Sequence, residues 1–131
     1  MMQIWHFCFI IAAVAALVGM SLGIFMGANE DFTLAPVHAH LNLLGWVSMF
    51  LYGLYYRGGQ HAPGRLARLQ VGVAALGFPG MTGGLAILLT GGGSVAYTLV
   101  MAGSILTISS MLLFMAVLLR DAYRTRHATG T

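Results

Sequence analysis

Hydrophobic positions along the chain gather into four long runs that are separated by short connections. The runs cover residues 4–28, 37–57, 65–90 and 95–120. Each run has the length of about 20 residues that an α-helix needs to cross a bilayer. The first connection contains Glu30 and Asp31, and the third is a glycine-rich stretch over residues 91–94. Because short connections make sequential helices antiparallel neighbours, the pattern predicts an up-down bundle of four helices.

Composition places this bundle in a membrane. Charged residues make up 7% of the 131 residues and hydrophobic residues 59%, whereas a soluble domain carries about 25% charged residues. Such a chain cannot cover its surface with polar groups. We therefore expect an all-α integral membrane protein with one four-helix transmembrane domain over residues 1–131, in contact with membrane lipid.

Charge predicts the orientation of the bundle. The six basic residues are all arginines and form two clusters, which are Arg57, Arg65 and Arg68, and Arg120, Arg124 and Arg126. In a four-helix bundle both clusters fall on the side of the N-terminus, while Glu30 and Asp31 fall on the other. The positive-inside rule then predicts two cytoplasmic termini, as in a bacterial inner membrane protein, with Tyr55 and Tyr56 in the inner aromatic belt. No basic surface is left for binding nucleic acid.

Glycines indicate how the helices pack. Gly19, Gly23 and Gly27 recur at every fourth position of the first run. The third run is richer in glycine and also contains Pro79. Small residues let two helix backbones approach closely in lipid. We expect close packing within the bundle, and association of the chain into a homo-oligomer.

Polar side chains begin the second run, where a plain membrane span would carry leucine. The notable positions are Pro36, His38, His40, Asn42, Gly45 and Trp46. Burying such polar groups costs a few kcal/mol each unless a partner satisfies them. Paired imidazoles there indicate a transition metal or a haem iron, or a specific polar contact.

Helical geometry separates the two imidazoles. At about 100° per residue, His38 and His40 point about 200° apart. One histidine alone then binds the metal, or an irregular helix start lets both chelate one ion. A third interpretation makes both histidines ordinary interfacial residues that bond to Glu30, Asp31 or lipid headgroups.

Each histidine begins a different face of the predicted helix. From His38 a polar and small-residue face runs through Asn42 and Gly45 toward the bundle interior. From His40 an apolar face runs through Leu43, Leu44, Val47 and Leu51. A flat porphyrin fits this second face with its iron on His40, and Gly45 beside Trp46 leaves room for a ring edge.

The remaining histidines and the methionines add little to this site. We interpret His6, His61 and His127 as solvated or interfacial residues. Met26 and Met101 are candidate axial ligands, because thioether sulfur also binds haem iron.

One stretch of the second run resembles a known family. Residues Ala39-His40-Leu41-Asn42-Leu43-Leu44-Gly45-Trp46, running into Met49-Phe50-Leu51-Tyr52-Gly53, resemble the second transmembrane helix of subunit I of the haem-copper oxidases and nitric oxide reductases. His38-x-His40 followed by Gly45 is also similar to the NnrS family of haem- and copper-containing membrane proteins. The resemblance implies that His40 binds a b-type haem near the outer face, with His38 as the competing assignment.

The resemblance also implies electron transport, or handling of O₂ or NO, together with a redox partner or a larger respiratory complex. The third and fourth runs contain no histidine, so the chain is not a complete oxidase. Two other functions stay open. One is a copper-handling membrane protein that uses His38-x-His40, and the other is a cofactor-free accessory subunit of a larger membrane complex.

Overall fold

The computed structural model describes residues 3–59 and 64–128, and every element within these ranges is helical. The elements are α1 (Ile4–Asn29), α2 (Ala35–His40), the π-helix η1 (Leu41–Ser48), α3 (Met49–Gly58), α4 (Arg65–Leu89) and α5 (Ser94–Ala128). The predicted all-α class is confirmed. Three of these helices, α1, α4 and α5, are long and apolar enough to cross a membrane.

The second apolar run folds differently from a uniform α-helix. The elements α2, η1 and α3 follow one another without a break over residues 35–58, which we call the second segment. Its middle third is π-helical, and the hydroxyl of Ser48 donates a hydrogen bond to the carbonyl of Leu43 at 2.8 Å, five residues earlier. The wider turn of a π-helix changes how side chains distribute around the axis, and such segments are frequent at functional sites.

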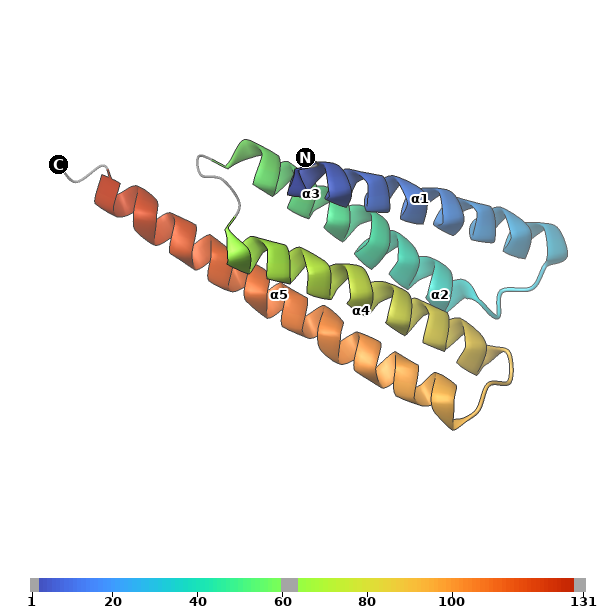
Figure 1. Cartoon of the computed structure of the whole chain (residues 1–131). Helices are drawn as coiled ribbons and strands as arrows, with labels where there is room; N and C mark the ends of the chain where they lie inside the picture. Colours follow the sequence, from blue (N-terminus) through green and yellow to red (C-terminus); the bar gives the residue numbers. More distant parts are fainter. Residues whose placement is uncertain (1–2, 60–63, 129–131) are drawn as a thin grey trace.

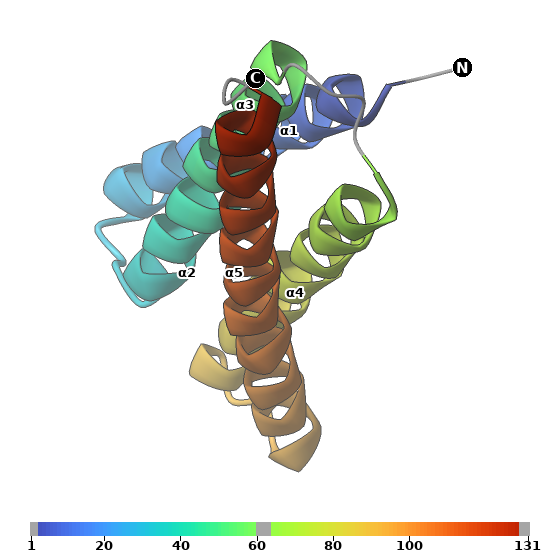
Figure 2. The same ribbon diagram turned by 90° about the vertical axis from the view of Figure 1, so that its left-hand side faces the viewer.

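The helices are arranged as two hairpins. The second segment packs against α1, and α4 packs against α5 along most of its length (Figure 1). Figure 2 shows the α4–α5 hairpin crossing the other one at an angle. A Cβ atom on Gly77 of α4 would lie 2.9 Å from the backbone nitrogen of Thr107. Glycine is therefore what lets α4 and α5 approach so closely.

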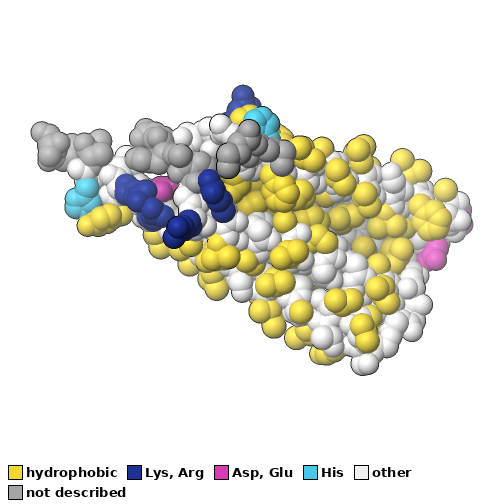
Figure 3. Space-filling view, viewed as in Figure 1, with side chains coloured by type: hydrophobic (Ala, Val, Ile, Leu, Met, Phe, Trp, Pro, Cys, Tyr) yellow, Lys and Arg dark blue, Asp and Glu magenta, His cyan; other side chains and the backbone are white. Residues whose placement is uncertain are grey.

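A few large side chains join the two hairpins. Phe78 of α4 contacts Gly45 of η1, because a Cβ atom on Gly45 would lie 2.8 Å from its ring. The ring of Tyr52 on α3 packs on Phe114 of α5, with 4.8 Å between centroids. Most other large apolar side chains point outward and remain exposed, as Figure 3 shows for one face. This distribution suits a lipid environment, since a soluble monomer rarely exposes so large an apolar surface.

Charged side chains lie near the ends of the helices. The arginines belong to the end of α3, the start of α4 and the end of α5, which lie together in Figure 1. We call this the arginine end. Glu30 and Asp31 follow α1 at the opposite end, which we call the acidic end and which also holds α2 (Figures 1 and 3).

Candidate functional site

His38 lies at the contact between α2 and α1. Its Nδ1 atom is 2.8 Å from the carbonyl oxygen of Gly19. Because a carbonyl oxygen only accepts, Nδ1 carries a proton and donates it, and in the neutral ring Nε2 is then the nitrogen with the lone pair. A Cβ atom on Gly23 would lie 2.9 Å from the His38 ring. The glycine at position 23 therefore makes the space that this ring fills.

Asn42 occupies the next position along the same contact. Its Nδ2 atom donates to the carbonyl oxygen of His38 at 2.8 Å. A Cβ atom on Gly19 would lie 2.6 Å from this amide nitrogen. Gly19, Gly23 and Gly27 form the glycine stripe of α1, and the first two of them thus accommodate polar side chains of the second segment.

His40 is exposed and makes its own hydrogen bond to the backbone. Its Nδ1 atom is 2.7 Å from the carbonyl oxygen of Pro36. The same argument makes Nδ1 the donor, so that Nε2 is free to accept or to bind a metal. Histidines that ligate metals commonly donate their other ring N–H to a carbonyl or carboxylate in this way.

The structure places the two histidines in different surroundings. Helix α2 (Ala35–His40) is a regular α-helix, and the π-helical segment begins only after His40. His38 is half-buried against α1, whereas His40 is exposed. Neither ring bonds to Glu30 or Asp31 within residues 3–59 and 64–128. The backbone carbonyls of Gly19 and Pro36 hold the rings instead.

The second segment has an inner and an outer face as predicted, except that Leu44, expected on the outer face, packs against the core. Asn42 and the buried Gly45 lie on the inner face, followed by Met49 and Tyr52, which are also buried. The outer face carries exposed apolar side chains, which we call the outer stripe: Leu43, Trp46, Val47, Phe50 and Leu51. His40 lies one turn before the first residue of this stripe.

Gly45 lies on the inner face of the second segment and Trp46 on the outer face. The space beside Gly45 is filled by Ala15 and Phe78, each 2.8 Å from where a Cβ atom would lie. Gly45 thus allows a three-helix contact within this chain. Trp46 is 42% exposed, and its indole N–H has no hydrogen-bond partner within the described residues. Its apolar ring and free N–H belong to the outer stripe.

The described residues do not assemble a metal cage. Within residues 3–59 and 64–128 there is no group of three or more His, Cys, Asp or Glu side chains that could hold a metal ion.

The other candidate histidines with described positions lie at the end of the molecule opposite α2. His6 stacks on Trp5, with 3.4 Å between ring centroids, and His127 packs against Tyr123 at 4.2 Å. Both belong to the arginine end (Figure 1). His61 falls outside the residues that the structure describes. Met26 is buried in α1, and Met101 is exposed on α5.

The loop before α2 carries a stable negative charge. The backbone N–H and the hydroxyl of Thr33 donate to Asp31 Oδ1 at 3.0 and 2.6 Å. These two hydrogen bonds lower the pKa of the Asp31 carboxyl. The carboxylate therefore stays ionised to a lower pH than usual, and the turn it forms loosens only as pH falls through that lowered pKa.

A polar cluster at the arginine end was not predicted. Tyr56 is only 7% exposed, so it is not a belt residue, and its hydroxyl donates to Gln70 Oε1 at 2.9 Å. Tyr55 donates to Asp121 Oδ2 at 2.9 Å. The signal in the sequence is the presence of Gln70 inside an apolar run and of Asp121 directly after another.

Comparisons with protein-family models, with curated proteins and with solved structures gave no match.

Proposed function

We propose that this protein crosses the bacterial inner membrane four times, in antiparallel order, with both termini in the cytoplasm. The second segment is the additional span, since it runs beside α1 without a break. Six arginines near the ends of α3, α4 and α5 support this orientation under the positive-inside rule. The acidic end, with His38 and His40, then faces the outside.

We further propose that the protein binds a b-type haem through Nε2 of His40. The observation that carries this proposal is the hydrogen bond from His40 Nδ1 to the Pro36 carbonyl, which makes Nε2 the nitrogen with the free lone pair in the neutral form of this exposed ring. This donor fits a haem iron, which takes neutral imidazole as an axial ligand. The hydrogen bond also fixes the orientation of the ring and raises the basicity of the ligand.

The outer stripe supports a haem on this face of the protein. Leu43 is 61% exposed and belongs to a continuous apolar surface that begins one turn after His40. A porphyrin needs an apolar surface on both of its sides, and one chain supplies one of them. A second copy of the chain completes the enclosure, in agreement with the expected homo-oligomer. When bound, the haem supplies a redox-active iron for electron transfer or for binding a small gas.

His38 has a different role in this proposal. Its ring packs on Gly23, where a Cβ atom would lie within 4 Å of Cε1, Nδ1 and Nε2 alike. No macrocycle fits on that side unless α1 moves away. We assign His38 to holding the second segment against α1, which keeps the helix start in place for His40.

A haem titration tests the assignment of the ligand. Haem-free protein in detergent is titrated with haem, and the Soret band is followed for the wild type and for His40→Ala, His38→Ala and the control His6→Ala. We expect His40→Ala to weaken haem binding at least tenfold. His6→Ala should leave binding unchanged, because His6 lies at the opposite end of the molecule.

Other results of this titration, and metal analysis of the purified protein, would select other functions. Loss of binding in His38→Ala but not in His40→Ala reassigns the ligand to His38. Copper at about one ion per chain, without haem, selects the copper-handling function, since imidazole also suits copper. Protein that is colourless and metal-free and that co-purifies with a larger complex selects the accessory subunit.

A further inference from the structure

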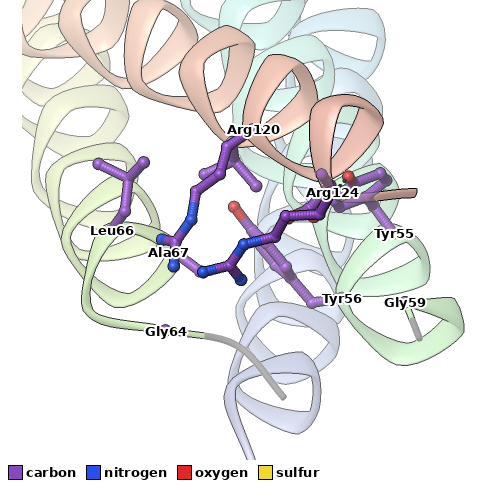
Figure 4. A pocket seen from close by; sticks show the side chains of 10 residues that line it. Tyr55, Tyr56, Gly59, Gly64, Leu66, Ala67, Arg120 and Arg124 are labelled. Atoms are coloured by element: carbon purple, nitrogen blue, oxygen red, sulfur yellow. Dashed lines mark hydrogen bonds between the residues drawn. The ribbon is translucent and has the colours of Figure 1, made fainter. Parts of the chain in front are cut away.

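The arginine end contains a cavity that the proposed haem function does not use. It has a volume of about 50 Å³ and lies where the end of α3, the start of α4 and the end of α5 meet (Figure 4). Its lining includes Tyr55, Tyr56, Ala67, Arg120, Asp121 and Arg124. A volume of this size holds a small polar group and not a whole lipid or cofactor.

Two cations, Arg120 and Arg124, converge on this cavity, and neither is ion-paired with an acidic side chain among the described residues. Figure 4 shows the side chains of Arg120 and Arg124 reaching from α5 toward each other, beside the first turn of α4. Neither guanidinium forms an ion pair or a hydrogen bond within residues 3–59 and 64–128. Two like charges that line one cavity repel each other, and the repulsion is relieved when an anion lies between them.

The one acidic group of the lining leaves this charge uncompensated. Asp121 accepts a hydrogen bond from the Tyr55 hydroxyl at 2.9 Å. The lining then carries two positive charges and one negative charge, so it is positive overall. Through the same hydrogen bond, the Asp121 carboxylate holds the Tyr55 side chain at the edge of the cavity.

The start of α4 adds backbone donors to the same cavity. Helix α4 begins at Arg65, and its N-cap residue Gly64 has no side chain to satisfy the first backbone N–H groups. Leu66 and Ala67, in this first turn, line the cavity. A Cβ atom on Gly64 would lie 3.7 Å from Arg120 Nη1, so the guanidinium lies beside the helix start. Free N–H groups and the helix dipole both favour an anion there.

We propose that this cavity binds a phosphate group, and that the phosphate belongs to an anionic phospholipid. Arginine matches phosphate geometry with paired N–H donors, and the cavity has room for the phosphate alone. Helices α3 and α5, which line the cavity, also carry exposed apolar side chains such as Leu54 and Leu119, which suit acyl chains. In the proposed orientation, this end lies at the leaflet where anionic lipids gather and where basic pockets between helices bind headgroups.

Lipid binding to the delipidated full-length chain tests this proposal. Phosphatidylglycerol is titrated into the wild type and into Arg120→Gln, Arg124→Gln and the double variant, and bound lipid is counted by native mass spectrometry. We expect the double variant to bind about tenfold more weakly or worse, because each arginine near the surface contributes to headgroup affinity. The matched control is Arg57→Gln, since Arg57 lies over the Trp5 ring, 5.5 Å from its centroid, and does not line the cavity.

Two further arms identify the source of the phosphate. Inorganic phosphate at millimolar concentration should not displace phosphatidylglycerol, and phosphatidylcholine should bind more weakly than phosphatidylglycerol. Displacement by inorganic phosphate would mean that the site takes a soluble phosphate and would overturn the lipid assignment. Unchanged phosphatidylglycerol binding by a double variant with wild-type helix content would overturn the site itself. If the double variant unfolds, phosphatidylglycerol binding and helix content are measured for each single arginine variant instead.

Discussion

At the scale of single residues, two glycines of α1 decide where the polar side chains of α2 and η1 lie. Gly23 faces the ring of His38, and Gly19 faces the amide of Asn42. Gly27 continues the same stripe but has no atom of a neighbouring element within 4 Å of its Cβ position. The stripe was predicted from the sequence, but the histidine and the asparagine that fill it were not.

This difference predicts the stability of two alanine variants. Gly23→Ala places a methyl group 2.9 Å from the His38 ring, and overpacking of this kind costs about 1–3 kcal/mol. Gly27→Ala meets open space and gains the helix propensity of alanine, about 1 kcal/mol. Unfolding in a denaturing detergent, followed by circular dichroism, should show Gly23→Ala as the less stable of the two. Equal stability would mean that the ring does not fill this space.

The hydrogen bond between Tyr56 and Gln70 supports a second residue-scale prediction. Gln70 is fully buried, and its Nε2 atom has no partner among the described residues, while Oε1 accepts from Tyr56. Tyr56→Phe leaves the whole amide unpaired and should destabilise the protein by about 1 kcal/mol.

The double variant Tyr56→Phe/Gln70→Leu provides the control. It removes both polar groups, so it should recover stability relative to Tyr56→Phe alone. A double variant that unfolds more easily than the single variant would show that the buried amide is stabilised by something other than Tyr56.

At the scale of elements, hydropathy predicted the positions of the helices except the end of α5, which continues past residue 120 to Ala128, and it did not predict the π-helical pitch of η1. The predicted second run, 37–57, agrees with the observed residues 35–58 to within two residues. The spacing of apolar and polar residues over Leu41–Ser48 does not distinguish an α-helix from a π-helix, because both give an inner and an outer face. The π-helical segment contains Gly45, which contacts Ala15 and Phe78, and both of these residues are distant from it in the sequence.

The contact between α4 and α5 predicts the effect of another pair of variants. A Cβ atom on Gly103 would collide with the backbone of Met81, whereas Gly83 has no such neighbour within 4 Å. Gly103→Ala must therefore push the two helices apart and should cost about 1–3 kcal/mol. Gly83→Ala should be neutral or slightly stabilising. Thermal unfolding in the same detergent compares them, and a neutral Gly103→Ala would contradict the close approach of α4 and α5.

At the scale of the whole molecule, the charged ends were predictable and the contacts within them were not. Arginine positions in the sequence were sufficient to predict that both clusters lie at one end. The divergence of His38 and His40 was equally predictable from helix geometry. The backbone carbonyls that hold these rings come from Gly19 and Pro36. The Gly19 carbonyl belongs to α1, not to the helix of His38, so this contact exists only once the chain has folded.

The same limit applies to the arginine end. Arg120 and Arg124 are one helical turn apart and were predicted only as topology signals. Their shared cavity depends on the start of α4 and the end of α3, which tertiary packing brings beside them. Long-range packing of this kind has no local pattern in the sequence.

The visible absorption spectrum of the protein, purified in mild detergent from cells supplied with haem, tests the central claim most directly. We expect a Soret band that sharpens and shifts on reduction with dithionite, and that is lost in His40→Ala but not in His6→Ala. Folded wild-type protein without any Soret band would contradict the claim that His40 binds haem.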